Sequence, residues 1–241
     1  MLDAAGRRAS QRQQDTTHGR VYAGLKAALI NGDFLPGQRL VVREIAERFE
    51  TSAMPVREAL RQLVSDEALF DHPHRGVIVP DATVEVISDL VRVRCSIEGA
   101  AAEWAASTIT ETELEAIEAL NDAMTACASN GEAANYLTLN REFHFSVYEA
   151  ARSQVIRPII ERLWLRAGPW LNIMRDGTAL GMGLDHHAEI LDSLGRGDGA
   201  RARRALVADI SDAADIMMRA ASRPARPVAR GPRQRWAAGG Q

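Results

Sequence analysis

The chain has 241 residues, of which 46% are hydrophobic and 25% charged, close to the averages of globular proteins. It contains no apolar run of about 18 residues that could span a bilayer, so we expect no membrane partner. The first twenty residues lack the apolar core of a secretory signal, which favours a cytoplasmic location. Cys95 and Cys127 form no Cys-x-x-Cys motif, so we expect neither a disulfide framework nor a cysteine-rich zinc site. The length suits two modest domains.

The formal net charge of −3 is unevenly distributed along the chain. Residues 1–80 carry 11 Lys and Arg against 10 Asp and Glu, residues 81–215 carry 12 against 22, and residues 216–241 carry six Arg and no acid. An acidic body repels phosphate, so a nucleic acid could dock only on a basic face of the N-terminal segment. We expect residues 1–17 to be a flexible arm and residues 223–241 a basic disordered tail.

The N-terminal third predicts a winged helix-turn-helix over residues 18–80. Apolar residues at helical spacing predict one helix over 18–31 and a second over 42–49. A third begins after Ser52, which can act as its N-cap. Two apolar runs flanking the segment 72–76 then predict a β-hairpin, the wing.

Residues 81–222 show only helical periodicity and predict an all-α bundle of six or seven helices, so the fold class is mainly α. We place the helices at 84–108, 111–129, 133–151, 154–175, 180–195 and 198–221. Thr110 followed by Glu113 reads as a capping box at the start of the second of these. No strand is followed by a glycine-rich phosphate loop, which argues against a nucleotide cofactor.

The segment from Gly32 to Gly76 resembles the DNA-reading domain of the GntR superfamily. The resemblance rests on Gly32-Asp33-Phe34-Leu35-Pro36-Gly37-Gln38-Arg39-Leu40, Arg43-Glu44-Ile45-Ala46, Ser52-Ala53-Met54-Pro55-Val56-Arg57-Glu58-Ala59-Leu60 and Arg75-Gly76, in that order. It implies double-stranded DNA as a partner and DNA contacts by Arg43, Arg57 and Gly76. The family usually has Arg where this chain has Ala53, so we expect an altered operator sequence or affinity.

Three further residues complete the predicted DNA-binding set: Ser52, Arg61 and Arg75. Arg61 lies one helical turn beyond Arg57 and could compensate for Ala53 by holding a phosphate. The alternative is that these arginines only form a solvated helix face. His72 and His74 of the wing are expected to be structural or merely exposed rather than phosphate ligands.

The second half resembles the FCD domain of the FadR branch of the same superfamily. The resemblance rests on Arg92-Val93-Arg94-Cys95-Ser96-Ile97-Glu98, Asn140-Arg141-Glu142-Phe143-His144 and His187-Ala188-Glu189-Ile190-Leu191. The family's metal site of one Asp and three His falls on Asn140, His144, His187 and Asp209, so two ligand types differ. We expect a divalent metal of the zinc, nickel or manganese class with mixed nitrogen and oxygen ligands. The alternative is a polar pocket with two hydrogen-bonded histidines and no metal.

The same pocket is expected to bind a small carboxylate or hydroxy-acid effector through Arg94, Asn140, His144 and His187. Arg94 is the candidate anchor for the carboxylate, and the family pattern points its side chain inward. The alternative is that Arg94 only pairs with Glu98, which lies four residues further along the same helix.

Together these features predict a transcriptional repressor that binds a palindromic operator as a homodimer and is released by its effector. The helical domain is the expected dimer interface. Two alternatives are a structural DNA-binding protein without effector sensing and a metal-dependent enzyme of the helical domain. No nucleophile–base pair and no Glu-x-x-His di-iron motif is present, so we expect no catalytic residue and no enzyme.

Overall fold

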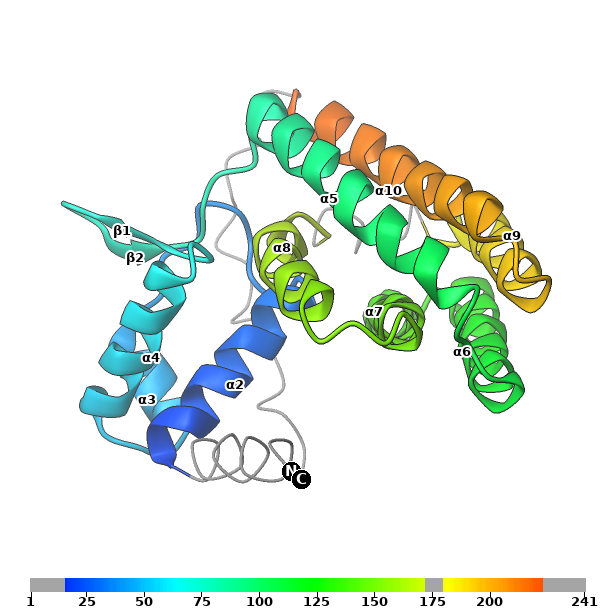
Figure 1. Cartoon of the computed structure of the whole chain (residues 1–241). Coiled ribbons are helices and arrows are strands. Elements are labelled where there is room, and N and C mark those ends of the chain that lie inside the picture. Colours follow the sequence, from blue (N-terminus) through cyan, green and yellow to red (C-terminus); the bar gives the residue numbers. More distant parts are fainter. Residues whose placement is uncertain (1–15, 172–179, 223–241) are drawn as a thin grey trace.

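The computed structural model describes residues 16–171 and 180–222, which form two helical domains side by side (Figure 1). The predicted tail lies outside these residues, as do residues 1–15 of the predicted arm and residues 172–175 of the helix predicted over 154–175. The N-terminal domain, called the reader below, consists of α2 (Thr17–Ile30), α3 (Val42–Arg48), α4 (Ala53–Ser65), β1 (Phe70–His72) and β2 (Gly76–Ile78). The mainly α fold class with a small N-terminal hairpin is therefore confirmed.

Local sequence signals define the elements of the reader. The hydroxyl of Thr16 accepts a hydrogen bond from the Gly19 backbone N–H and so caps the start of α2. At the start of α4, Ser52 occupies the N-cap position, but its side chain makes no capping hydrogen bond, contrary to our prediction. The antiparallel hairpin pairs Phe70 with Ile78 and projects away from the helical domain (Figure 1). The wing is thus held at its base and is exposed at its tip.

The helical domain consists of α5 (Val84–Ala105), α6 (Glu111–Asn130), α7 (Ala133–Ala150), α8 (Ile156–Leu171), α9 (Leu184–Gly195) and α10 (Gly199–Ala221). The long helices α5 and α10 run side by side, and α7 and α8 lie beneath α5 (Figure 1). The predicted start of the fifth helix at residue 180 is wrong, because a turn precedes Leu184. In that turn Gly181 has a positive φ of 81°, which a helix does not allow.

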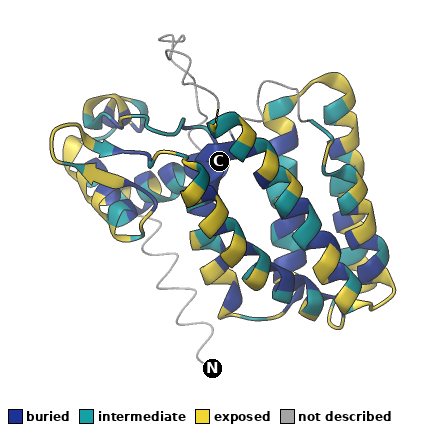
Figure 2. Ribbon diagram, turned by 90° about the horizontal axis from the view of Figure 1, so that it is seen from above, coloured by how far each residue is buried: buried dark blue, intermediate teal, exposed yellow. Residues whose placement is uncertain are grey.

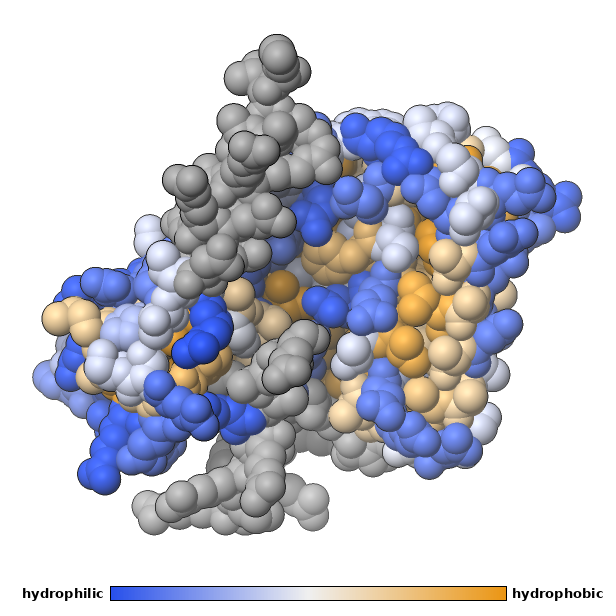
Figure 3. All heavy atoms as spheres, turned by 90° about the horizontal axis from the view of Figure 1, so that it is seen from below, coloured by the Kyte–Doolittle hydropathy of each residue, from blue (hydrophilic) through white to orange (hydrophobic). Residues whose placement is uncertain are grey.

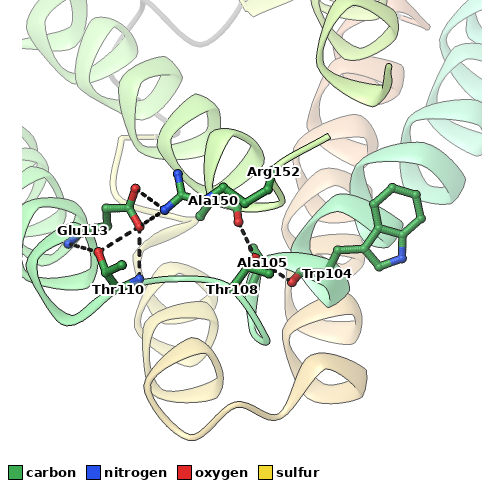
Figure 4. Close-up of polar contacts among 7 residues, drawn as sticks. All are labelled: Trp104, Ala105, Thr108, Thr110, Glu113, Ala150 and Arg152. Atoms are coloured by element: carbon green, nitrogen blue, oxygen red, sulfur yellow. Dashed lines mark hydrogen bonds and ion pairs between the residues drawn. The ribbon is translucent and has the colours of Figure 1, made fainter. Parts of the chain in front are cut away.

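The turn between α5 and α6 is tied to the end of α7 by polar contacts (Figure 4). Thr110 and Glu113 form the predicted capping box. Glu113 also accepts two hydrogen bonds from the Arg152 guanidinium, at 2.6 and 2.7 Å. The Thr108 hydroxyl donates to the backbone carbonyl of Ala150. These contacts hold the turn between α5 and α6 against the C-terminal end of α7.

The core is formed by the inward faces of the helices, and the outward faces carry most of the exposed residues (Figure 2). Seen from below, hydrophobic side chains gather on the helical domain within a hydrophilic border (Figure 3). None of the helices in residues 16–171 and 180–222 combines the length and hydropathy that crossing a membrane requires.

The two domains meet where α2 packs on α8. Gly168 makes this approach close, because a Cβ there would lie 2.7 Å from the Ile30 Cα and would overlap the Leu29 carbonyl oxygen. Two ion pairs flank the contact, Lys26 with Glu161 at 2.9 Å and Arg166 with Glu67 at 3.5 Å. The reader is therefore in direct backbone contact with the helical domain.

Candidate functional site

Four of the residues considered for DNA contact surround one open hollow between α3 and α4. Arg43, Ser52, Ala53 and Arg57 all line it, and its volume is about 580 Å³. In a helix-turn-helix the start of the second helix faces the major groove, so this hollow lies where base edges and phosphates would meet the protein. Ala53 contributes only a methyl group to the wall of this hollow.

The charged side chains around the hollow are exposed to solvent. Arg43 pairs with Glu47 through an Nε–Oε1 distance of 2.9 Å, with both side chains largely exposed. Such a pair is weak and can exchange for a phosphate. Arg57 and Arg61 are exposed on α4 and make no ion pair within the described residues. Met54, beside them, is 63% exposed, so α4 also offers an apolar contact.

The wing places Arg75 and Gly76 at its exposed tip. Gly76 has a φ of 69°, and a Cβ there would meet nothing within 4 Å, so backbone conformation rather than lack of space favours glycine. In the turn, the ring Nδ1 of His72 accepts a hydrogen bond from the His74 backbone N–H at 3.1 Å. This contact agrees with the structural role expected for His72.

Three of the predicted metal ligands meet inside the helical domain. His144 of α7, His187 of α9 and Asp209 of α10 are all buried, and their ligand atoms lie within 4.8 Å of one another. The Nε2 of His144 lies 3.2 Å from Oδ2 of Asp209. Three helices distant in sequence therefore contribute to one cluster, which we call the His–Asp cluster.

The environment of His187 fits a metal ligand. Neither of its buried ring nitrogens has a hydrogen-bond partner among the described residues, which is unfavourable without a further ligand. Burial lowers the pKa of His187 to about 4, which keeps the imidazole neutral, as metal binding requires. Its ring stacks on Phe143 at a centroid distance of 4.3 Å, which fixes its orientation.

The environment of Asp209 also fits a metal ligand. Burial alone would raise the pKa of Asp209, but the hydrogen bond and charge of His144 outweigh it, and the pKa lies below its usual value. A Cβ on Gly183 would lie 2.6 Å from the Asp209 Oδ1, so only glycine leaves the space beside this carboxylate open. Two imidazoles and one carboxylate form a donor set suited to zinc, nickel or manganese.

Asn140 and Arg94, the other predicted pocket residues, line small cavities beside the cluster. Asn140 borders two of them, of about 30 and 50 Å³, and Asp209 also borders both. Arg94, buried as predicted, borders the smaller one together with His144 and Asp209. The structure thus brings together all five residues predicted for the metal and effector sites.

Arg94 also forms the alternative pairing with Glu98. Its Nε and Nη2 donate to the fully buried Glu98 carboxylate at 2.6 and 3.1 Å. Glu98 accepts further hydrogen bonds from the Tyr148 hydroxyl and the Trp164 indole. Burial and the nearby Glu98 raise the pKa of Tyr148 well above its usual value. An effector carboxylate would therefore have to share Arg94 with Glu98.

Sequence reasoning missed Tyr148, whose hydroxyl lies 3.3 Å from Nδ1 of His144. The signal that could have found it is the spacing of four residues, which puts both side chains on the same face of α7. The indole N–H of Trp164, from α8, joins the same polar network.

Two family models match the chain in the order of its two domains. The model described as "Bacterial regulatory proteins, gntR family" matches residues 17–79, and the FCD domain matches residues 89–212. The HTH-type transcriptional regulator McbR of Escherichia coli K12 is 31% identical over 150 residues, which are 62% of this chain and 68% of that regulator. The galactonate operon transcriptional repressor of the same strain is 25% identical over 223 residues, covering 80% of this chain and 93% of the repressor.

Solved structures give the same result. E. coli McbR/YncC superimposes with a TM-score of 0.80 at 26% identity, covering 85% of this chain and 98% of that chain. A putative GntR transcriptional regulator from Rhodococcus sp. RHA1 gives a TM-score of 0.70, also at 26% identity, over 84% and 98% of the two chains. The relatives are regulators, so the enzyme alternative is rejected. The chain belongs to the GntR family of bacterial regulatory proteins, carries a C-terminal FCD domain, and is a DNA-binding transcriptional regulator.

Proposed function

We propose that the chain is a metabolite-responsive repressor that binds a palindromic operator as a dimer and is released by a small carboxylate or hydroxy acid. The observation that carries this proposal is the buried His–Asp cluster beside Arg94, in a chain whose other domain reads DNA. A purely structural DNA-binding protein has no need of a buried cluster in which neither ring nitrogen of His187 has a hydrogen-bond partner among the described residues. A repressor role also matches the names of two relatives, the galactonate operon repressor and the probable D-xylose utilization operon repressor of Paenarthrobacter nicotinovorans.

Support for a dimer comes from the outward face of α5. Val86, Val93 and Trp104 are 37%, 40% and 48% exposed, and their spacing puts them on one side of the helix. A line of large apolar side chains on a surface helix favours burial against a second copy. Trp104→Glu is expected to turn the dimer into a monomer and to weaken operator binding, measured by light scattering and by DNA titration. A Trp104→Glu protein that remains dimeric would exclude this face as the interface.

A divalent cation would be held by His144, His187 and Asp209, with Asn140 as a further neutral oxygen donor. When bound, the cation supplies positive charge beside Arg94, and so favours a negatively charged effector. Asp209 and His187 would bind it directly, and Arg94 would orient a carboxylate by charge-assisted hydrogen bonds. The cavities of about 30 and 50 Å³ have room for only a few water molecules, so an effector must widen them.

The wall that an effector would displace includes α8. Trp164, Trp170 and Leu171 border the smaller cavity, and the same helix contacts α2 of the reader at Gly168. Movement of α8 would therefore change the position of the reader. We expect the change in operator affinity to correspond to about 1–3 kcal/mol, an ordinary coupling free energy.

The first experiment is affinity selection of fragmented genomic DNA by the purified protein at a salt concentration near physiological. Recovery of a few sites that share a short palindrome is expected. DNA without a common pattern would favour the structural DNA-binding alternative. The selected site then serves to screen small organic acids, where the His144→Ala protein should keep operator affinity but lose the response to the active acid. An equal response in this variant would remove the sensor role of the His–Asp cluster.

A further inference from the structure

Glu98 is a buried carboxylate on which hydrogen-bond donors from three helices converge. Arg94 of α5 donates twice, Tyr148 of α7 donates at 2.5 Å, and Trp164 of α8 donates at 3.0 Å. The Glu98 side chain is fully buried, and the Arg94 guanidinium balances its charge. An ionised carboxylate offers only acceptors, so every one of these partners must be the donor.

The direction of the Tyr148–Glu98 hydrogen bond has a consequence for His144. The phenol has a single proton, which it donates in the hydrogen bond to Glu98. Toward Nδ1 of His144, 3.3 Å away, the phenol oxygen can therefore only accept, so Nδ1 must carry a proton. The other nitrogen, Nε2, itself shares a hydrogen bond with Asp209, so a cation would have to displace that proton, which would leave a neutral imidazole with its proton on Nδ1 and a lone pair on Nε2.

That other nitrogen is the one that faces the His–Asp cluster. Nε2 of His144 lies 3.2 Å from Oδ2 of Asp209, whereas Nδ1 points to Tyr148. We propose that Tyr148, itself fixed by Glu98, is a positioning residue that sets the tautomer and ring orientation of His144, so that Nε2 is presented to a divalent cation. This inference rests on the metal site proposed above.

Zinc binding by the full-length protein tests the proposal. Tyr148→Phe removes only the hydroxyl and keeps the buried ring. We expect its Kd for Zn²⁺, measured by calorimetry, to rise about 10- to 100-fold, the usual effect of losing a partner of a metal-bound histidine. Tyr22→Phe is the matched control, because it removes a phenol hydroxyl that also donates to a carboxylate, that of Asp66 at 2.7 Å, but in the reader. Its Kd for Zn²⁺ should equal that of the wild type.

A second measurement is made on the wild type itself, and a variant serves only to assign its signals. Long-range proton–nitrogen spectra of the zinc-loaded wild type, with His144 assigned by comparison with His144→Gln, should show a protonated Nδ1 and a zinc-bound Nε2. Coordination through Nδ1, or an unchanged Kd in folded Tyr148→Phe while the wild type binds zinc, would overturn the positioning role alone. A wild type that binds no zinc would overturn the metal site and this inference with it.

Discussion

Gly168 offers a direct test of the contact between the two domains. Replacing it by alanine adds one methyl group where α8 crosses the end of α2. The new Cβ would lie 2.7 Å from the Ile30 Cα and 2.8 Å from its carbonyl oxygen, and nearer still to the Leu29 carbonyl oxygen. All three are backbone atoms, so no side chain can rotate away. The two helices must separate.

The magnitude follows from ordinary contact distances. Carbon atoms pack best at about 3.5–4.0 Å, so α2 and α8 must move apart by about 1 Å, and the surrounding contacts lose part of their dispersion energy. Overpacking of this kind costs about 1–3 kcal/mol. The usual gain of alanine over glycine inside a helix, about 0.5–1 kcal/mol, offsets only part of this. Pro169 follows directly, and alanine before proline tolerates the helical conformation less well than glycine does.

Urea unfolding followed by circular dichroism measures the effect, and hydrogen exchange of the amides of Leu29 and Ile30 localises it. We expect Gly168→Ala to lower the free energy of unfolding and to speed exchange at the end of α2. Gly195→Ala is the control, because its Cβ would meet only the flexible end of Leu114, at 3.2 Å. Because Gly195 is the last residue of α9, alanine gains less there than inside a helix, and this variant should change stability by less than about 0.5 kcal/mol. A Gly168→Ala protein as stable as this control would refute the close packing of α2 on α8.

Three further predictions concern other parts of the molecule. Arg57→Ala should weaken operator binding by about 1–3 kcal/mol if Arg57 contacts a base. Arg61→Ala should mainly reduce the slope of log affinity against log salt concentration, by about one. DNA titrations at several salt concentrations distinguish the two effects. Hydrogen bonds from Arg152 and the Thr110 backbone lower the pKa of Glu113 to about 2, so this carboxylate stabilises the fold above its usual pKa of 4.5 and loses that contribution as the pH falls toward 2. The melting temperature of Glu113→Gln should therefore lie below that of the wild type at pH 7, by a small amount because the pair is exposed, and the difference should shrink below pH 4.5; a constant difference would contradict the assignment. Asn140→Asp should tighten Zn²⁺ binding in calorimetry, because a carboxylate is a stronger ligand than an amide oxygen, and unchanged affinity would place residue 140 outside the metal site.

Features that depend on neighbouring residues could be predicted from the sequence. The capping box of Thr110 and Glu113 needs a separation of three residues, and the pairing of Arg94 with Glu98 needs four. The start of α9 was misplaced by four residues, because helical periodicity does not report the positive φ of Gly181.

Features that depend on the meeting of distant segments required either the family resemblance or the structure. Asp209 joins His144 and His187 from a third helix, and no spacing rule connects residues 144 and 209. The resemblance supplied this grouping. Gly168 was not predicted at all, because its role is set by backbone atoms more than 130 residues earlier in the chain.

The position of α8 gives a physical reason for coupling the two domains. Its Trp164 is held by the buried Glu98, its last residues border the cavity beside Asp209, and its Gly168 rests on the backbone of α2. A ligand shifts an equilibrium only by the difference between its affinities for the two states. Because the cavity is too small for the proposed effector as it stands, its binding would have to favour a state in which this wall has moved. At Gly168 the backbones of α8 and α2 are already in contact, so α8 cannot move toward α2 without displacing it. In the proposed mechanism, this displacement of the reader by α8 is sufficient to release the operator.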